Sequence, residues 1–232
     1  MRAPKPGIRA VLATGLMTAA LVTGGTVAAV DLTPNAVANA EAAAPAGTAP
    51  EGVTLAYSPL LEVAKGLPKV SAQQVLNLAT SQVGTSENPY GGGTKFHHWY
   101  MNSDRAAETI ARDGGTRYGY ANAPWCDMFV SWVGNQLGIS PVLGEDAYTV
   151  RHAEWFAQNN RWGTVPAPGA VVFFDWNGGK DIHDIQHVGF VIKDNGDGTI
   201  ETVEGNTGNG VVEVRERQTA DVVGYGYPVY TA

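Results

Sequence analysis

Cys126, the single cysteine of the 232-residue chain, has the sequence surroundings of a reactive thiol. It follows Pro124 and Trp125 and precedes an apolar run, a pattern typical of the start of a helix. A thiol in the first helical turn lies at the positive end of the helix dipole, which favours the thiolate. That arrangement is common for a nucleophile. A buried thiol or half of an intermolecular disulfide is the alternative.

A nucleophile needs a base within hydrogen-bond reach, and His187 is the best placed of the five histidines. It opens an alternating strand, and Asn195-Gly196 beyond that strand strongly indicates a β-hairpin. If those two residues are the whole loop, Glu204 lies directly across from His187 on the same face. Asn206 projects from that face two residues further on. A surface His–Glu pair is the alternative, and a longer loop through Asp197-Gly198 would shift the register.

Two other patterns could suggest a metal site, but neither is favoured. His183 and His187 have the spacing of two zinc ligands, but they lie in a predicted loop and strand instead of on a helix. The acidic segment 194–198 is too short for an EF-hand and lacks its terminal glutamate. We therefore expect neither a metal nor another cofactor.

The elements that must position these side chains follow from the spacing of apolar residues. Ser71 and Gln74 form a capping-box pattern before a helix that ends near Gly84. Periodicity predicts further helices over 104–112, 126–137 and 147–158. After Pro168 the period changes to two residues, which predicts strands over 170–176, 187–193, 199–204, 211–215 and 222–230. Helices followed by antiparallel strands indicate an α+β domain.

All six tryptophans lie between residues 99 and 176. Trp99, Trp125 and Trp176 adjoin predicted loops and could line a groove for a glycan or peptide. Trp132 and Trp155 fall within predicted helices, and we expect them in the core.

Residues 1–40 have the pattern of an export signal. A basic head precedes the uncharged stretch 10–30, and the small-x-small triplet at 38–40 suits signal peptidase. An uncleaved membrane anchor is the alternative, but glycines and threonines weaken that helix and favour cleavage. Residues 41–70 are rich in Ala and Pro and predict a linker, which leaves one folded domain over 71–232.

Composition excludes several classes of protein. With 44% hydrophobic and 9% aromatic residues the chain is neither wholly disordered nor fibrous. One cysteine excludes an intramolecular disulfide scaffold and a zinc site of several thiolates. The net charge of −7 argues against a nucleic-acid-binding protein that depends on bulk electrostatics. No feature of the sequence indicates an oligomer, so we expect a monomer.

Four motifs, in this order, resemble those of a CHAP domain (cysteine, histidine-dependent amidohydrolase/peptidase). They are Pro-Trp-Cys-Asp-Met-Phe-Val at 124–130, Pro-Gly-Ala-Val-Val-Phe-Phe at 168–174, His-Val-Gly-Phe-Val at 187–191 and Val-Glu-Gly-Asn at 203–206. The resemblance implies a papain-like α+β fold in which N-terminal helices, with the nucleophile at a helix start, pack on an antiparallel sheet. It also implies peptidoglycan as the usual substrate.

Position by position, the resemblance implies a role for each residue of the site. Cys126 is the nucleophile, and His187 is the general base and then the general acid. Glu204 orients the imidazole, and Asn206 is a polar residue that supports it.

Two hypotheses of function follow. The first is a secreted, cell-wall-associated peptidoglycan hydrolase that cleaves amide bonds through a thioester on Cys126. It would be an N-acetylmuramoyl-L-alanine amidase or an endopeptidase of stem peptides or cross-bridges, with no nucleic-acid partner and no stable membrane association. The second is a non-catalytic cell-wall-binding or structural module on the same fold. The complete set of four residues favours the enzyme.

Overall fold

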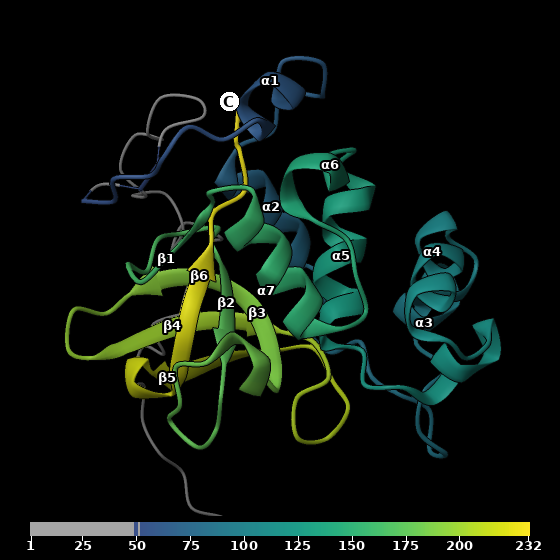
Figure 1. Cartoon of the computed structure of the whole chain (residues 1–232). Coiled ribbons are helices and arrows are strands. Elements are labelled where there is room, and N and C mark those ends of the chain that lie inside the picture. The colour runs from purple at the N-terminus through teal and green to yellow at the C-terminus, as the bar shows by residue number, and fades with distance from the viewer. Residues whose placement is uncertain (1–48, 51) are drawn as a thin grey trace, which may run out of the picture. The chain divides into compact units, whose positions relative to one another are not determined.

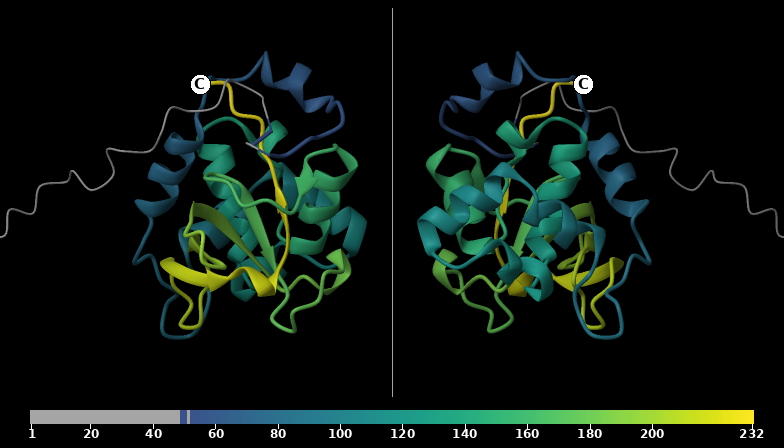
Figure 2. Two further views of the ribbon diagram at one scale, coloured as in Figure 1. Left: turned by 90° about the vertical axis from the view of Figure 1, so that its left-hand side faces the viewer. Right: turned by 90° about the vertical axis from the view of Figure 1, so that its right-hand side faces the viewer.

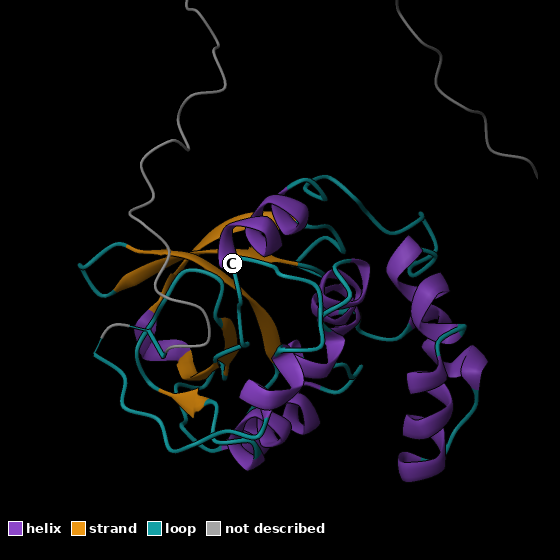
Figure 3. Ribbon diagram, turned by 90° about the horizontal axis from the view of Figure 1, so that it is seen from above, coloured by secondary structure: helices purple, strands orange, loops and turns teal. Residues whose placement is uncertain are grey.

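The computed structural model describes residues 49–50 and 52–232 (Figure 1). The predicted export signal and the first part of the predicted linker lie outside the described residues. The described part is α+β, with helices along the first half of the chain and an antiparallel sheet in the second. Seen from above, helices and strands occupy different sides of the domain (Figure 3). The predicted fold class is confirmed at this level.

The helices before the sheet include the four that periodicity predicts and three short ones that it misses. The capping box is present: Ser71 Oγ accepts from Gln74 N at 3.2 Å, and Gln74 Oε1 accepts from Ser71 N at 2.9 Å. The helices are α1 (Leu60–Ala64), α2 (Ala72–Thr80), α3 (Lys95–Met101), α4 (Asp104–Asp113), α5 (Cys126–Gln136), α6 (Ser140–Leu143) and α7 (Thr149–Gln158).

The strands form one six-stranded sheet in the order β1-β6-β2-β3-β4-β5, with every described pairing antiparallel. Strand β5 begins two residues later than predicted, and β6 ends earlier because the chain reaches Pro228, which has no N–H for a ladder. The strands are β1 (Trp162–Gly163), β2 (Val171–Phe174), β3 (His187–Asp194), β4 (Thr199–Glu204), β5 (Glu213–Gln218) and β6 (Val222–Gly226).

The main core lies between the sheet and the helices. Phe129 on α5 meets Phe190 on β3 edge to face, with ring centroids 6.3 Å apart. A smaller apolar cluster covers the other face of the sheet and includes Phe174 and Ile200. These two clusters explain why β2 and β3 are almost continuously apolar and do not alternate.

Part of the predicted linker packs against the domain. Leu60 and Ala64 on α1 are buried in the main core, and Val53 and Leu55 pack on the other face of the sheet. The C-terminal segment passes beside this region, where Thr231 N donates to Val70 O at 3.0 Å (Figure 2). The packed part of the chain therefore begins before residue 71.

The predicted register of the β3–β4 hairpin is wrong. Asp194 pairs with Ile200, so the loop enclosed by the last pair of the two strands has five residues (195–199, the last of which also begins β4) instead of two. The reason is local: Asp194 Oδ1 accepts from Gly196 N at 3.0 Å, and Asp197 Oδ1 accepts from Thr199 N at 3.0 Å. Two such side-chain turns in succession compete with the two-residue turn that Asn-Gly favours.

A β-bulge corrects the consequence of that longer loop. The register shifts between Val191 and Lys193, so that Phe190 faces Val203. Continued to the end of the strands, this register places Gly189 opposite Glu204 and His187 diagonally from it, on the same face. Without the bulge, His187 would point to the opposite face. The predicted juxtaposition is thus retained, but as a diagonal pair.

Gly189 is the residue that leaves room for the diagonal pair. A Cβ built there would lie 2.7 Å from Glu204 Cγ and 2.9 Å from Val203 O. The Glu204 side chain therefore crosses the space above Gly189 to reach His187. Any side chain at Gly189 would occupy that path.

Gly189→Ala should therefore lower the free energy of unfolding by about 1–3 kcal/mol, because the new methyl group displaces Glu204 or the strand. Gly119→Ala is the matched control, since a Cβ there meets nothing within 4 Å. Urea unfolding of both variants measures the difference. Wild-type stability in Gly189→Ala would contradict the register described above.

Candidate active site

Cys126 is the first residue of α5, and its position is set by Trp125 before it. The Trp125 indole is fully buried, stacks on Phe96 with centroids 5.2 Å apart, and donates from Nε1 to Glu87 Oε1 at 2.8 Å. The prediction that Trp125 could line a groove is therefore wrong, because the ring fixes the helix start from inside. Only 5% of Cys126 is exposed.

The end of β4 lies against this first turn of α5. A Cβ at Gly205 would lie 2.8 Å from Trp125 Cζ3 and 2.7 Å from Phe129 Cβ. A glycine therefore allows the strand that carries Glu204 to approach the helix that carries Cys126. This contact joins the two halves of the predicted site.

His187 is buried between the thiol and a carboxylate. Its Nε2 donates to Glu204 Oε2 at 2.9 Å, which leaves Nδ1 as the ring nitrogen available to Cys126. Burial lowers the pKa of His187, but the hydrogen bonds with Cys126 and Glu204 and their charges outweigh it. The pKa of His187 is raised to about 9. The imidazolium is therefore the dominant form at neutral pH.

The Glu204 carboxylate has no exposed surface, yet it stays charged because four donors surround it. Oε1 accepts from Thr202 Oγ1 at 2.5 Å and from Arg217 Nε at 2.9 Å. Oε2 accepts from His187 Nε2 and from Arg217 Nη2, the latter at 2.6 Å. Burial raises the pKa of Glu204, but Arg217, His187 and Thr202 lower it to about 2.

Asn206 is not brought into this network. It follows β4 in a left-handed conformation with φ of 55°, is half-exposed, and its side chain makes no hydrogen bond within the described residues. A φ in that region is tolerated by asparagine better than by most residues. The supporting role of Asn206 stays a prediction.

Sequence reasoning missed Arg217 and Thr202, but it named Trp176 among the residues that could line a groove. Trp176 lies 5.6 Å from the His187 ring between centroids, is 43% exposed and stacks on Phe174. Of the tryptophans predicted to line a groove, it is the one beside His187. A signal for Arg217 exists in the alternation of charged residues along β5, but alternation alone indicates only an exposed edge strand.

A second buried histidine–carboxylate pair lies directly after Cys126. Asp127 Oδ1 and His152 Nδ1 are 2.7 Å apart, and His152 Nε2 donates to Leu143 O at 2.9 Å. Burial raises the pKa of Asp127. Burial lowers the pKa of His152, but the charge and hydrogen bond of Asp127 reverse that and raise it overall. The pair shares a proton and ties the first turn of α5 to α7.

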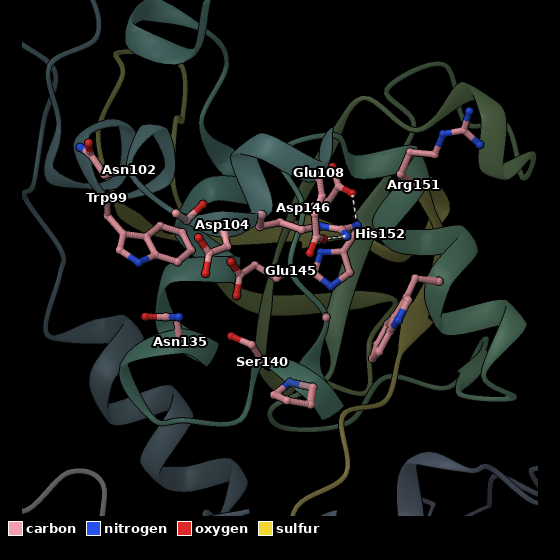
Figure 4. A pocket seen from close by; sticks show the side chains of 15 residues that line it. Trp99, Asn102, Asp104, Glu108, Asn135, Ser140, Glu145, Asp146, Arg151 and His152 are labelled. Carbon is pink, nitrogen blue, oxygen red and sulfur yellow. Dashed lines mark hydrogen bonds and ion pairs between the residues drawn. The ribbon is translucent and has the colours of Figure 1, made fainter. Parts of the chain in front are cut away.

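A cavity of about 710 Å³ lies apart from Cys126 and His187, which do not line it (Figure 4). Residues of α3, α4, α5, α6 and α7 and of the connection between α6 and α7 line it, and Trp99, Trp155 and Glu145 are among them. Trp99 therefore lines this cavity and not a groove at Cys126. Trp155 and Trp132 are partly buried and pack against the core, as predicted.

The structure separates the two histidines that have zinc-ligand spacing. His183 is exposed and lies 3.6 Å from Glu154, whereas His187 is buried against Glu204. Among the described residues, no group of three or more histidine, cysteine or acidic side chains is placed to hold a metal ion.

The raised pKa of His187 predicts that its ring loses its proton only at alkaline pH. Titration of the His187 ring by NMR should have a midpoint of about 9 in the wild type. Cys126→Ala should lower that midpoint, because the thiol contributes a hydrogen bond and charge to the imidazolium. The stability gained from the protonated ring is complete below its ordinary pKa of 6.5 and is lost as the pH rises through about 9. A wild-type midpoint near 6.5 would contradict the described contacts.

The Asp127–His152 pair predicts a coupled effect on stability. His152→Leu should lower the free energy of unfolding by about 3–5 kcal/mol, because it leaves a buried carboxyl group without its partner. The double variant Asp127→Leu/His152→Leu should recover part of that loss, since neither polar group remains. Urea unfolding of these two variants and of Asp127→Leu alone checks the coupling, with the exposed His98→Leu as the control. Strictly additive effects of the two single changes would show that the residues are not coupled.

One comparison with known proteins gives a match. Residues 115–206 match the family model of the CHAP domain, and the match includes Cys126, His187 and Glu204. A comparison with curated proteins and with solved structures found no significant match. CHAP domains have a papain-like fold, which suits the α+β architecture and the antiparallel sheet described above. Residues 115–206 thus match the CHAP domain family, which supports a CHAP domain in this part of the chain.

Proposed function

We propose that this protein is an exported peptidoglycan hydrolase that cleaves amide bonds with Cys126 as nucleophile. CHAP domains are typically hydrolase domains that act on peptidoglycan as amidases or peptidases. The observation that carries the proposal is the placement of the buried His187 between Glu204, its hydrogen-bond partner at 2.9 Å, and Cys126 at the start of α5. It has the order of nucleophile, base and orienting group that acyl transfer requires.

The chemistry follows from the charges of the three groups. The Cys126 thiolate attacks the amide carbonyl carbon and forms a tetrahedral oxyanion. The His187 imidazolium then donates its proton to the leaving amine, and a thioester remains. His187, now neutral, takes a proton from water, which attacks the thioester and releases the carboxylic acid and the Cys126 thiolate, so that the thiolate and the imidazolium are restored. Glu204 holds the ring and stabilises its charged form throughout.

The oxyanion needs hydrogen-bond donors that are already in place. The first N–H groups of a helix have no partner within the helix, so the backbone N–H of Cys126 is a suitable donor. The helix dipole of α5 favours negative charge at the same point. Both effects stabilise the tetrahedral state more than the neutral amide.

Export and location are parts of the proposal that rest on the sequence pattern of residues 1–40. In the described part of the chain, no helix is long and apolar enough to cross a membrane. The proposed partner is peptidoglycan, and the proposed scissile bond is either the muramoyl–alanine amide or an amide within or between stem peptides. The protein acts as a monomer at the cell wall.

Cys126→Ser should abolish cleavage of purified sacculi of defined stem-peptide chemistry, because the hydroxyl does not form the nucleophilic anion at neutral pH. Mass spectrometry of the released fragments measures the loss and names the bond that the wild type cuts. New amino termini from the wild type alone would support the hydrolase. Binding of both proteins to sacculi without release by either would identify a binding module and exclude the proposed function.

Two histidines provide a matched control within the same assay. The cleavage activity of His187→Gln should fall to that of Cys126→Ser. The exposed His183→Gln should keep wild-type activity. Equal activity of the two histidine variants would contradict the role of His187.

A further inference from the structure

We propose that Arg217 is a positioning residue of this site, which holds Glu204 in the orientation that His187 requires and balances the charge of the buried site. This inference rests on the proposed function, because it concerns the same three groups. Arg217 lies on β5, outside the residues that match the CHAP domain model. It does not touch the thiol or the imidazole in any described contact, so it acts through Glu204.

The first support is the geometry of the ion pair. Arg217 Nε binds Glu204 Oε1 at 2.9 Å, and Arg217 Nη2 binds Oε2 at 2.6 Å. Two parallel bonds from a planar guanidinium fix the plane of the carboxylate as well as its position. Oε2 is thereby held where it accepts from His187 Nε2 at 2.9 Å. A lysine could supply the charge at this position but not the fixed plane.

The second support is that Arg217 is itself held in place. Its guanidinium carbon lies 4.8 Å from the centroid of the Trp176 ring and 5.9 Å from that of Phe174. Trp176 and Phe174 stack with their planes 12° apart and centroids separated by 5.1 Å. An arginine over an aromatic face gains a cation–π interaction and loses less freedom when it forms hydrogen bonds. The side chain is 25% exposed, against 0% for Glu204.

The third support is the sum of charges. In the reactive state Cys126 and Glu204 each carry a negative charge, and His187 carries one positive charge. Those three groups alone leave one negative charge unbalanced in a buried site, which opposes ionisation of the thiol. Arg217 supplies the missing positive charge. The four groups then carry no net charge.

Other charged groups face Arg217 from the surface side. Glu213 on β5 and Asp221 after it act on the guanidinium through their charges. Glu213 is also paired with Arg215 and accepts from Thr207 Oγ1 at 2.7 Å. His187, Thr202 and Glu204 complete the polar groups on the inner side.

The test uses the purified protein with Arg217→Met, Arg217→Lys and, as the matched control, Arg215→Met two residues away on the same strand. The rate of alkylation of Cys126 by iodoacetamide is followed by mass spectrometry across pH 4–10, and kcat and KM are measured on soluble peptidoglycan fragments. Urea unfolding of each variant separates loss of stability from loss of function.

Arg217→Met should raise the midpoint of the alkylation curve by about one pH unit, because a neighbouring positive charge is removed. It should lower kcat by about tenfold or more with little change in KM, because the imidazole is no longer held in a productive position. Arg217→Lys should restore the midpoint but only part of kcat. Arg215→Met should match the wild type in both readouts.

Two results would overturn the proposal. One is a folded Arg217→Met variant with the wild-type alkylation curve and kcat. The other is a lower free energy of unfolding alone, which would make Arg217 only a structural link between β4 and β5. If Arg217→Met does not fold, Arg217→Gln is judged by the same criteria. If the wild type cleaves no peptidoglycan, the proposed function fails, but the alkylation curves still decide the role of Arg217.

Discussion

The charge on the buried Glu204 carboxylate is the constraint on which the rest of the site depends. A carboxylate without solvent is stable only when its oxygens are surrounded by donors. Three neighbouring strands supply those donors: His187 comes from β3, Thr202 from β4 itself, and Arg217 from β5. The register of the strands, the bulge after Val191 and the absence of a side chain at Gly189 can all be understood as conditions for satisfying this one group.

Among the helices, α5 is the one that brings Cys126 to the Glu204 site. Gly205 lets the end of β4 approach the first turn of the helix, which brings the thiol of Cys126 next to His187. On the other side, Asp127 bonds His152 on α7, so the same helical turn is tied to both the sheet and the helices. A side chain held from two sides has little freedom to leave its position, which is the preorganisation that the proposed acyl transfer requires.

Two tryptophans near the site have different roles, one in the core and one at the surface. Trp125 lies inside and fixes the helix start, with its N–H satisfied by Glu87. Trp176 lies at the surface beside His187, and the guanidinium of Arg217 lies over its ring. Both rings follow or precede a regular element, and no local pattern distinguishes them. Their roles depend on which segments, distant in sequence, pack against them.

By itself, the sequence determined the α+β class, the helix that begins at Cys126, and the hairpin that joins His187 to Glu204. These features depend on local periodicity, capping and turn residues, which act over a few positions. Only the tertiary structure decided that the loop has five residues, that a bulge restores the shared face, and that Arg217 completes the carboxylate's partners. The loop length follows from the side-chain turns of Asp194 and Asp197, which compete with the turn that Asn-Gly favours. The shared face and the partners of Glu204 depend on the offsets between three strands, where a shift of one residue moves every later side chain to the opposite face.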